Sequence, residues 1–144
     1  GIYDQVKDAT TFELDVRTAA AAYEKAGIGP DDLDVAEVHD AFTIAEIIHY
    51  EDLGFCAKGE GGRLVEEGVT DLGGRLPVST GGGLISRGHP LGATGVAQVV
   101  EVTTQLRGEA GDRQVAGARV GLTHVAGGFF EGDIATSAIT VLSR

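Results

Sequence analysis

The stretch that decides the fold is GGGLISRGHPLGATG at residues 81–95, where one histidine lies among glycines immediately before an amphipathic helix. Glycine adopts positive φ without steric cost, and the first N–H groups of a helix have no intrahelical partner. His89 lies at that helix end, and its imidazole can donate or accept a proton near neutral pH. Because a structural glycine turn seldom needs an imidazole, we interpret His89 as functional. Gly82, Gly83 and Gly88 are the backbone positions expected to approach a bound ligand.

The composition excludes several function classes. The chain has 144 residues, which suits one domain with a real core. Its formal net charge is −11 and only three of its eleven basic residues are lysines, so no basic stripe is expected to bind nucleic acid or an anionic membrane. No apolar run reaches the roughly 20 residues of a membrane-spanning helix. The single cysteine, Cys56, is compatible with a reducing compartment, and we expect a cytoplasmic protein.

Apolar side chains recur at helical spacing in three segments, and these predict helices over about 10–27, 41–53 and 96–107. Thr10 and Glu13 have the spacing of a capping box at the start of the first helix. Glycines follow the first and third segments and are expected to end those helices.

Short apolar runs predict strands at 35–38, near Val78, at 119–125 and at 134–142, the last two joined as a hairpin. The glycine-rich, charged segment at about 54–76 is an expected surface excursion with one short helix. This order of elements packs most simply as an α/β fold, in which a mixed sheet is covered by helices. Residues 1–144 are therefore expected to form one domain.

Three of the four histidines fall at or near strand ends, where open α/β sheets place their sites. His39 follows the first strand, and a structural and a functional interpretation are equally open for it. Its neighbour Asp40 is expected to cap the following helix. For His124, a hydrogen-bonded histidine of the core is the simpler interpretation. His49 is expected to be a partly exposed residue of the second helix.

Three motifs together resemble the C-terminal half of thiolase-superfamily enzymes: HDAF at 39–42, GGGLISRGHPLGATG at 81–95 and HVAGG at 124–128. HDAF is similar to the variant in sterol-carrier-type and archaeal thiolases. The resemblance implies a thiolase-like β-α-β-α-β-α-β-β half with a mixed sheet, packed against a second half that carries the nucleophilic cysteine. Alone, this chain is then expected to be inactive, and the valines of its third helix are expected to expose an apolar face.

The resemblance also implies roles for the histidines. His89 matches the residue that deprotonates the nucleophile and helps hold the thioester oxygen, and His39 matches a position that fixes a water or donates to that oxygen. His124 matches the cysteine that exchanges a proton with the substrate α-carbon. Ala41 stands where related thiolases carry a substitute cysteine. The absence of both cysteines resembles a branch that acts as aldolases or works with a small OB-fold partner.

The leading hypothesis is the C-terminal catalytic half of a thiolase-like acyl-CoA acyltransferase of lipid metabolism. It implies a coenzyme A thioester as substrate, no covalently bound cofactor, an N-terminal thiolase half as partner, and a homo- or hetero-oligomer. Two alternatives are a retro-aldolase that cleaves β-hydroxyacyl-CoA with an OB-fold partner, and a non-catalytic assembly module. A metal site built from His39, Asp40, His89 and His124 is a further alternative, but no HxxxH or CxxC spacing supports it, and we expect no metal.

Overall fold

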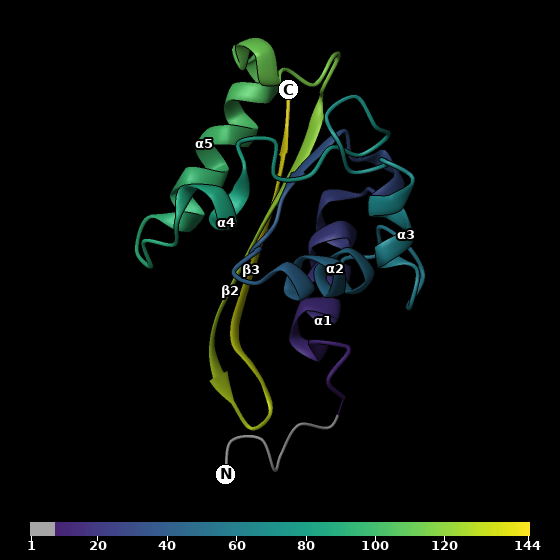
Figure 1. Ribbon diagram of the computed structural model, residues 1–144, viewed down its shortest axis with the longest axis vertical. Helices are drawn as coiled ribbons and strands as arrows, with labels where there is room; N and C mark the ends of the chain where they lie inside the picture. Colours follow the sequence, from purple (N-terminus) through teal and green to yellow (C-terminus); the bar gives the residue numbers. More distant parts are fainter. Residues whose placement is uncertain (1–7) are drawn as a thin grey trace.

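The computed structural model describes residues 8–144, which form a three-stranded sheet with helices on both faces (Figure 1). Helices α4 and α5 lie on one side of the sheet, and α1, α2 and α3 lie on the other (Figure 1). In chain order the elements are α1 (Glu13–Ala26), η2 (Pro30–Asp32), β1 (Val35–Glu37), α2 (Thr43–Asp52), α3 (Gly61–Glu66), α4 (Gly83–Arg87), α5 (Thr94–Arg107), η3 (Gly111–Arg113), β2 (Val120–Phe130) and β3 (Asp133–Ser143).

The sheet is mixed, as the sequence predicts. β1 runs parallel to β2 in the register Val35↔Gly121, and β2 pairs antiparallel with β3. The strand expected near Val78 is reduced to one isolated parallel bridge with Ala36. The hairpin strands are longer than expected, because the turn is confined to Glu131 and Gly132. Both residues have positive φ, 51° and 85°, as in a type I′ turn, whose twist matches that of the flanking strands.

The start of α1 differs from the prediction. The residue before the helix is Phe12, and no side chain caps it, so the capping box of Thr10 and Glu13 is wrong. The Thr10 hydroxyl donates instead to Asp8, while the Phe12 N–H donates to Asp52 at 2.7 Å, which ties the helix start to α2. The predicted ends of α1 and α5 are confirmed, since the glycines after both helices adopt the left-handed conformation.

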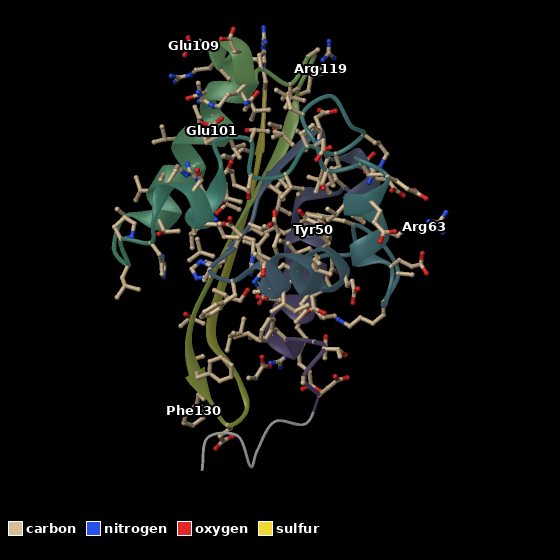
Figure 2. The ribbon with its side chains drawn as sticks, in the orientation of Figure 1. Tyr50, Arg63, Glu101, Glu109, Arg119 and Phe130 are labelled. Atoms are coloured by element: carbon tan, nitrogen blue, oxygen red, sulfur yellow. The ribbon has the colours of Figure 1, made fainter. Side chains whose placement is uncertain are left out.

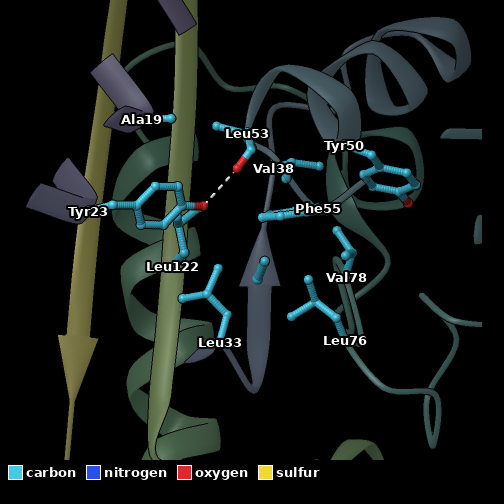
Figure 3. Close-up of a cluster of buried hydrophobic side chains, with 11 residues drawn as sticks. Ala19, Tyr23, Leu33, Val38, Tyr50, Leu53, Phe55, Leu76, Val78 and Leu122 are labelled. Carbon is cyan, nitrogen blue, oxygen red and sulfur yellow. Dashed lines mark hydrogen bonds between the residues drawn. The ribbon is translucent and has the colours of Figure 1, made fainter. Parts of the chain in front are cut away.

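The core has two parts, one on each face of the sheet. The larger lies between the sheet and α1 and α2, and there the Tyr23 hydroxyl donates to the carbonyl of Leu53 at 2.9 Å (Figure 3). The smaller lies under α5 and includes Val35 and Val102. The helix approaches the sheet closely at Gly121, where a Cβ atom would lie 2.5 Å from Val102 Cγ1. Both parts pack against the short parallel strand pair and fix the position of its carboxyl end.

Helix α5 exposes the face that its valines define. Val96 is 65% exposed and Val100 58% exposed, whereas the opposite face, with Val102 and Leu106, is buried against the sheet. This confirms the expected apolar face on the third helix. Over residues 8–144, none of the helices combines the length and apolar character that crossing a bilayer requires.

Candidate active site

A pocket of about 550 Å³ lies between the start of α2, the glycine turn and the outer half of the β2–β3 hairpin. Its wall is largely apolar but includes three imidazoles, from His39, His49 and His89. A concave apolar site with a few convergent polar groups is the usual form of a small-molecule site. We therefore take this pocket as the candidate active site.

The structure brings His39 and His89 together from segments that lie far apart in the sequence. Their ring centroids are 4.8 Å apart and the rings meet edge to face at 85°. His39 lies two residues after the end of β1 and is buried, whereas His89 is exposed in the turn before α5. Burial, and then the neighbouring histidines His89 and His124, lower the pKa of His39 to about 4. The His39 ring is therefore neutral at physiological pH.

A hydrogen-bond chain fixes the proton on His89. When the Thr94 hydroxyl donates to the carbonyl of Pro90, 3.2 Å away, it can accept from the N–H of His89 Nδ1, 2.8 Å away. The neutral His89 ring then carries its proton on Nδ1. Its Nε2 lone pair is free, which is the state that a general base requires.

His124 is fully buried and is not part of the pocket wall. Its Nδ1 accepts a hydrogen bond of 3.4 Å from the His39 N–H, just beyond the point where the β1–β2 ladder ends. Its Nε2 lies 2.9 Å from Asp15 Oδ1. Burial lowers the pKa of His124, although Asp15 opposes the shift. The ring is thus neutral, with its proton on Nε2.

Asp15 and His49 were not identified from the sequence as site residues. Asp15 Oδ2 lies 3.1 Å from His49 Nδ1, and both residues are buried. The expectation that His49 is partly exposed is wrong, because the α2 face that carries it packs toward α1. The sequence carries one signal for Asp15. Asp15, Ala19 and Tyr23 are spaced at i, i+4 and i+8, so they share one helix face, and this is the buried face of α1.

Asp40 has a structural role other than the predicted one. Its carboxylate accepts the N–H groups of Leu84 at 2.7 Å and Ile85 at 3.3 Å, so it caps α4 and not the helix that follows it in sequence. Asp40 and its neighbours in the metal alternative, His39, His89 and His124, do not form a group close enough to share an ion among residues 8–144. Within residues 8–144, the one group of three side chains close enough for a shared ion is Asp15, His49 and His124.

The three glycines predicted to approach a ligand all have positive φ: 93° at Gly82, 60° at Gly83 and 83° at Gly88. Gly83 is buried directly against the Asp40 carboxylate, whereas Gly82 and Gly88 are exposed. These positions are restricted to glycine by the backbone. The turn holds His89 next to His39.

An ion pair between a half-buried arginine and a buried glutamate joins the two segments that carry His39 and His89. Arg87 Nη2 lies 2.7 Å from Glu37 Oε2, and the Glu37 side chain is fully buried. The partner of Arg87 is therefore this carboxylate. Burial raises the pKa of Glu37 to about 7, although Arg87 opposes the shift.

Replacing Glu37 with glutamine is expected to change how stability depends on pH. The folded-state pKa of Glu37, about 7, is above its ordinary value of 4.5, so its stabilising contribution is complete below pH 4.5 and is lost as the pH rises through 7. The difference between these two pKa values corresponds to about 3 kcal/mol. The parent loses this stabilisation as the pH rises from 4.5 to 8, and Glu37→Gln does not. Over that range the free energy of unfolding of Glu37→Gln should therefore rise by about 3 kcal/mol relative to that of the parent.

Urea unfolding at a series of pH values measures this effect. Glu66→Gln, at an exposed position, serves as the control and should follow the parent at every pH. If Glu37→Gln also follows the parent, its carboxylate does not titrate as described.

Comparison with known proteins supports the resemblance. Residues 2–144 match the family described as thiolase C-terminal domain-like. Acetyl-CoA acetyltransferase of Methanothermobacter thermautotrophicus is 51% identical over 138 residues, which are 96% of this chain and 35% of that protein. Sterol carrier protein 2 of Bos taurus is 54% identical over 113 residues, 78% of this chain and 21% of that protein. Benzoylsuccinyl-CoA thiolase subunit BbsB of Thauera aromatica is 44% identical over 127 residues, 88% of this chain and 33% of that protein.

A solved structure, the Ltp2-ChsH2(DUF35) aldolase, superposes with a TM-score of 0.80 at 26% identity, over 95% of this chain and 34% of that chain. This chain spans about a third or less of the length of each of these relatives. The motifs, the mixed sheet with its helices and the match over nearly every residue agree. The chain belongs to the thiolase C-terminal domain-like family.

Proposed function

We propose that this domain supplies the acid–base and oxyanion-binding half of the active site of a thiolase-like acyl-CoA acyltransferase. The nucleophile is contributed by an N-terminal thiolase half. The observation that carries this proposal is the edge-to-face pair of His39 and His89 at the wall of the pocket. One imidazole of the pair is exposed and has a free nitrogen, and the other is held neutral by burial.

His89 is the general base in this proposal. Its Nδ1 proton is held by Thr94, so Nε2 can take the proton of the thiol nucleophile and return it to the leaving group. His39, which is neutral, donates a ring N–H to the thioester oxygen as negative charge develops there. Gly82, Gly83 and Gly88 let the backbone of the turn approach the coenzyme A thioester. No covalently bound cofactor takes part.

His124 acts in this proposal as a positioning residue. A direct exchange of its proton with a substrate would require a ring at the pocket wall, and His124 does not line the pocket. Its contact with the site is the hydrogen bond that it accepts from the His39 backbone. It therefore orients His39 and does not itself touch substrate.

The partner that covers the domain is expected to be the N-terminal half, within a homo- or hetero-oligomer. Leu91 next to the glycine turn is 85% exposed, and Phe130 at the far end of the hairpin is 67% exposed (Figure 2). Together with Val96 and Val100 they leave much apolar surface in water. Burial of this surface against the second half is the simplest way to stabilise it.

A second candidate function is retro-aldol cleavage of a β-hydroxyacyl-CoA with an OB-fold partner. The superposition on the Ltp2-ChsH2(DUF35) aldolase favours it, as does alanine at position 41. The same His39 and His89 would then stabilise an enolate oxygen and move a proton without a covalent acyl intermediate.

Two assays of the full-length protein distinguish these functions. An acyltransferase should exchange isotopically labelled coenzyme A with acetyl-CoA, because a covalent acyl intermediate forms and reverts. An aldolase should instead release an aldehyde or ketone from a β-hydroxyacyl-CoA and show no exchange. If neither reaction occurs, the domain is a non-catalytic assembly module and the proposal is wrong.

A further inference from the structure

His49 is an imidazole of the pocket wall that none of the three motifs contains. It comes from α2 and lies against the buried ring of His124, with centroids 4.4 Å apart at 61°. Its Nδ1 faces the Asp15 carboxylate at 3.1 Å. Within the described part of the chain, its Nε2 has no hydrogen-bond partner and is not among the fully buried polar atoms. That nitrogen is therefore the one that reaches the pocket.

The Asp15 carboxylate fixes which nitrogen of His49 is free. His124 uses its Nδ1 to accept from the His39 N–H, so its Nε2–H donates to Asp15 Oδ1. Burial favours the protonated acid, but the contacts with His124 and His49 outweigh it and hold the pKa of Asp15 well below its ordinary value. Asp15 Oδ2 is thus a charged group 3.1 Å from His49 Nδ1, outside hydrogen-bond geometry, and its charge favours the tautomer with the His49 proton on Nδ1 and the lone pair on Nε2.

We propose that His49 is the second acid–base residue of the site, which exchanges a proton with the α-carbon of the bound acyl-CoA. Asp15 is its positioning residue. The inference rests on the proposed acyltransferase function and deepens it. It assigns to His49 the task for which the motif match had suggested His124, because His49 lines the pocket and His124 does not.

The step balances in protons and electrons. His49 Nε2 takes the α-proton, the C–H electron pair forms an enolate, and the neutral His39 ring donates to the enolate oxygen. The enolate carbon attacks the acyl group held on the nucleophile. A carbon–carbon bond forms, the carbon–sulfur bond breaks, and the nucleophile leaves as a thiolate. His49 releases the α-proton to solvent, and His89 Nε2 takes up one proton from solvent and passes it to the thiolate, so both imidazoles end neutral. The Asp15 carboxylate stabilises the His49 imidazolium that exists between these events.

The test separates two half-reactions in the full-length protein. Exchange of labelled coenzyme A with acetyl-CoA needs the nucleophile and His89 but no α-proton transfer. Exchange of the acetyl-CoA methyl protons with deuterium, followed by NMR, needs the α-carbon base. His49→Gln should slow the deuterium exchange by about 100-fold or more and change the coenzyme A exchange by less than about threefold. Asp15→Asn should slow the deuterium exchange by about tenfold.

Chemical rescue distinguishes a catalytic from a structural role. Added imidazole should restore deuterium exchange in His49→Ala, since the truncated side chain leaves space at the pocket wall. Ile48→Ala is the matched control, because its side chain lies on the same helix but lines a different pocket, and both exchange rates should stay near those of the parent.

Other outcomes would overturn the inference. Equal losses of both exchange reactions in His49→Gln, without rescue of His49→Ala, would make His49 structural. Unchanged deuterium exchange in His49→Gln would exclude it as the base while leaving the proposed function intact. A stoichiometric metal ion that is lost in Asp15→Asn would show that these side chains are ligands. By contrast, a parent protein without coenzyme A exchange would refute the proposed function itself.

Discussion

The His89→Ala variant of the full-length protein is expected to turn over acyl-CoA at least about 10³-fold more slowly than the parent. Two effects are lost together. General acid–base catalysis contributes about 10²–10⁴-fold, and a hydrogen bond to an oxyanion about 10²–10³-fold. The two are not additive when one side chain supplies both. Because the exposed ring contributes little to the core, the variant should remain folded, and kcat should fall far more than KM rises.

Steady-state kinetics of two variants side by side gives the measurement. Thr94→Val removes the hydroxyl that fixes the His89 proton but keeps the imidazole, so we expect a loss of about tenfold only. A His89→Ala variant with kcat within tenfold of the parent would remove the central residue of the proposed function. A Thr94→Val variant as inactive as His89→Ala would indicate that the turn, and not the imidazole, is what matters.

Local sequence patterns predicted the elements that stand around the site. Helical spacing located α1, α2 and α5, and the glycine after α5 ends that helix as expected. Short apolar runs located β1, β2 and β3, although β2 extends through Gly127 and Gly128, beyond the strand end predicted at 125. Glycine is compatible with a strand when the partner strand supplies the hydrogen bonds, and a sequence pattern does not show which partner is present.

Contacts between distant segments could not be read from the sequence. Glu37 and Arg87 lie 50 positions apart, and His49 meets Asp15 only because α2 packs against α1. The position of Asp40 in the sequence predicts a cap for α2, the helix that follows it. In the fold, the turn that begins at Gly83 approaches Asp40 closely, and the Leu84 N–H donates to its carboxylate. Charge and spacing along the chain identify groups that need partners. Which partner each finds is decided by the packing of the sheet and helices.

The Gly83→Ala substitution is expected to destabilise the protein by about 3–5 kcal/mol and to abolish most of its activity. Gly83 has a φ of 60°, and a Cβ atom there would overlap the Asp40 carboxylate. To make room, the buried carboxylate must move away from the Leu84 and Ile85 N–H groups, so charged hydrogen bonds are lost in addition to the backbone strain. Asp40 also follows His39 directly, so both imidazoles of the pair should shift.

Urea unfolding and turnover of Gly83→Ala and Gly92→Ala test whether the close approach of Gly83 to the Asp40 carboxylate organises the site. Gly92 lies in the same turn, and a Cβ atom there would meet nothing within 4 Å. Its φ is not in the positive range, so Gly92→Ala should change the free energy of unfolding by less than about 0.5 kcal/mol and leave kcat near that of the parent. Equal stabilities of the Gly83→Ala and Gly92→Ala variants would mean that Asp40 can retreat without loss. The turn would then hold His89 beside His39 through the Glu37–Arg87 pair alone.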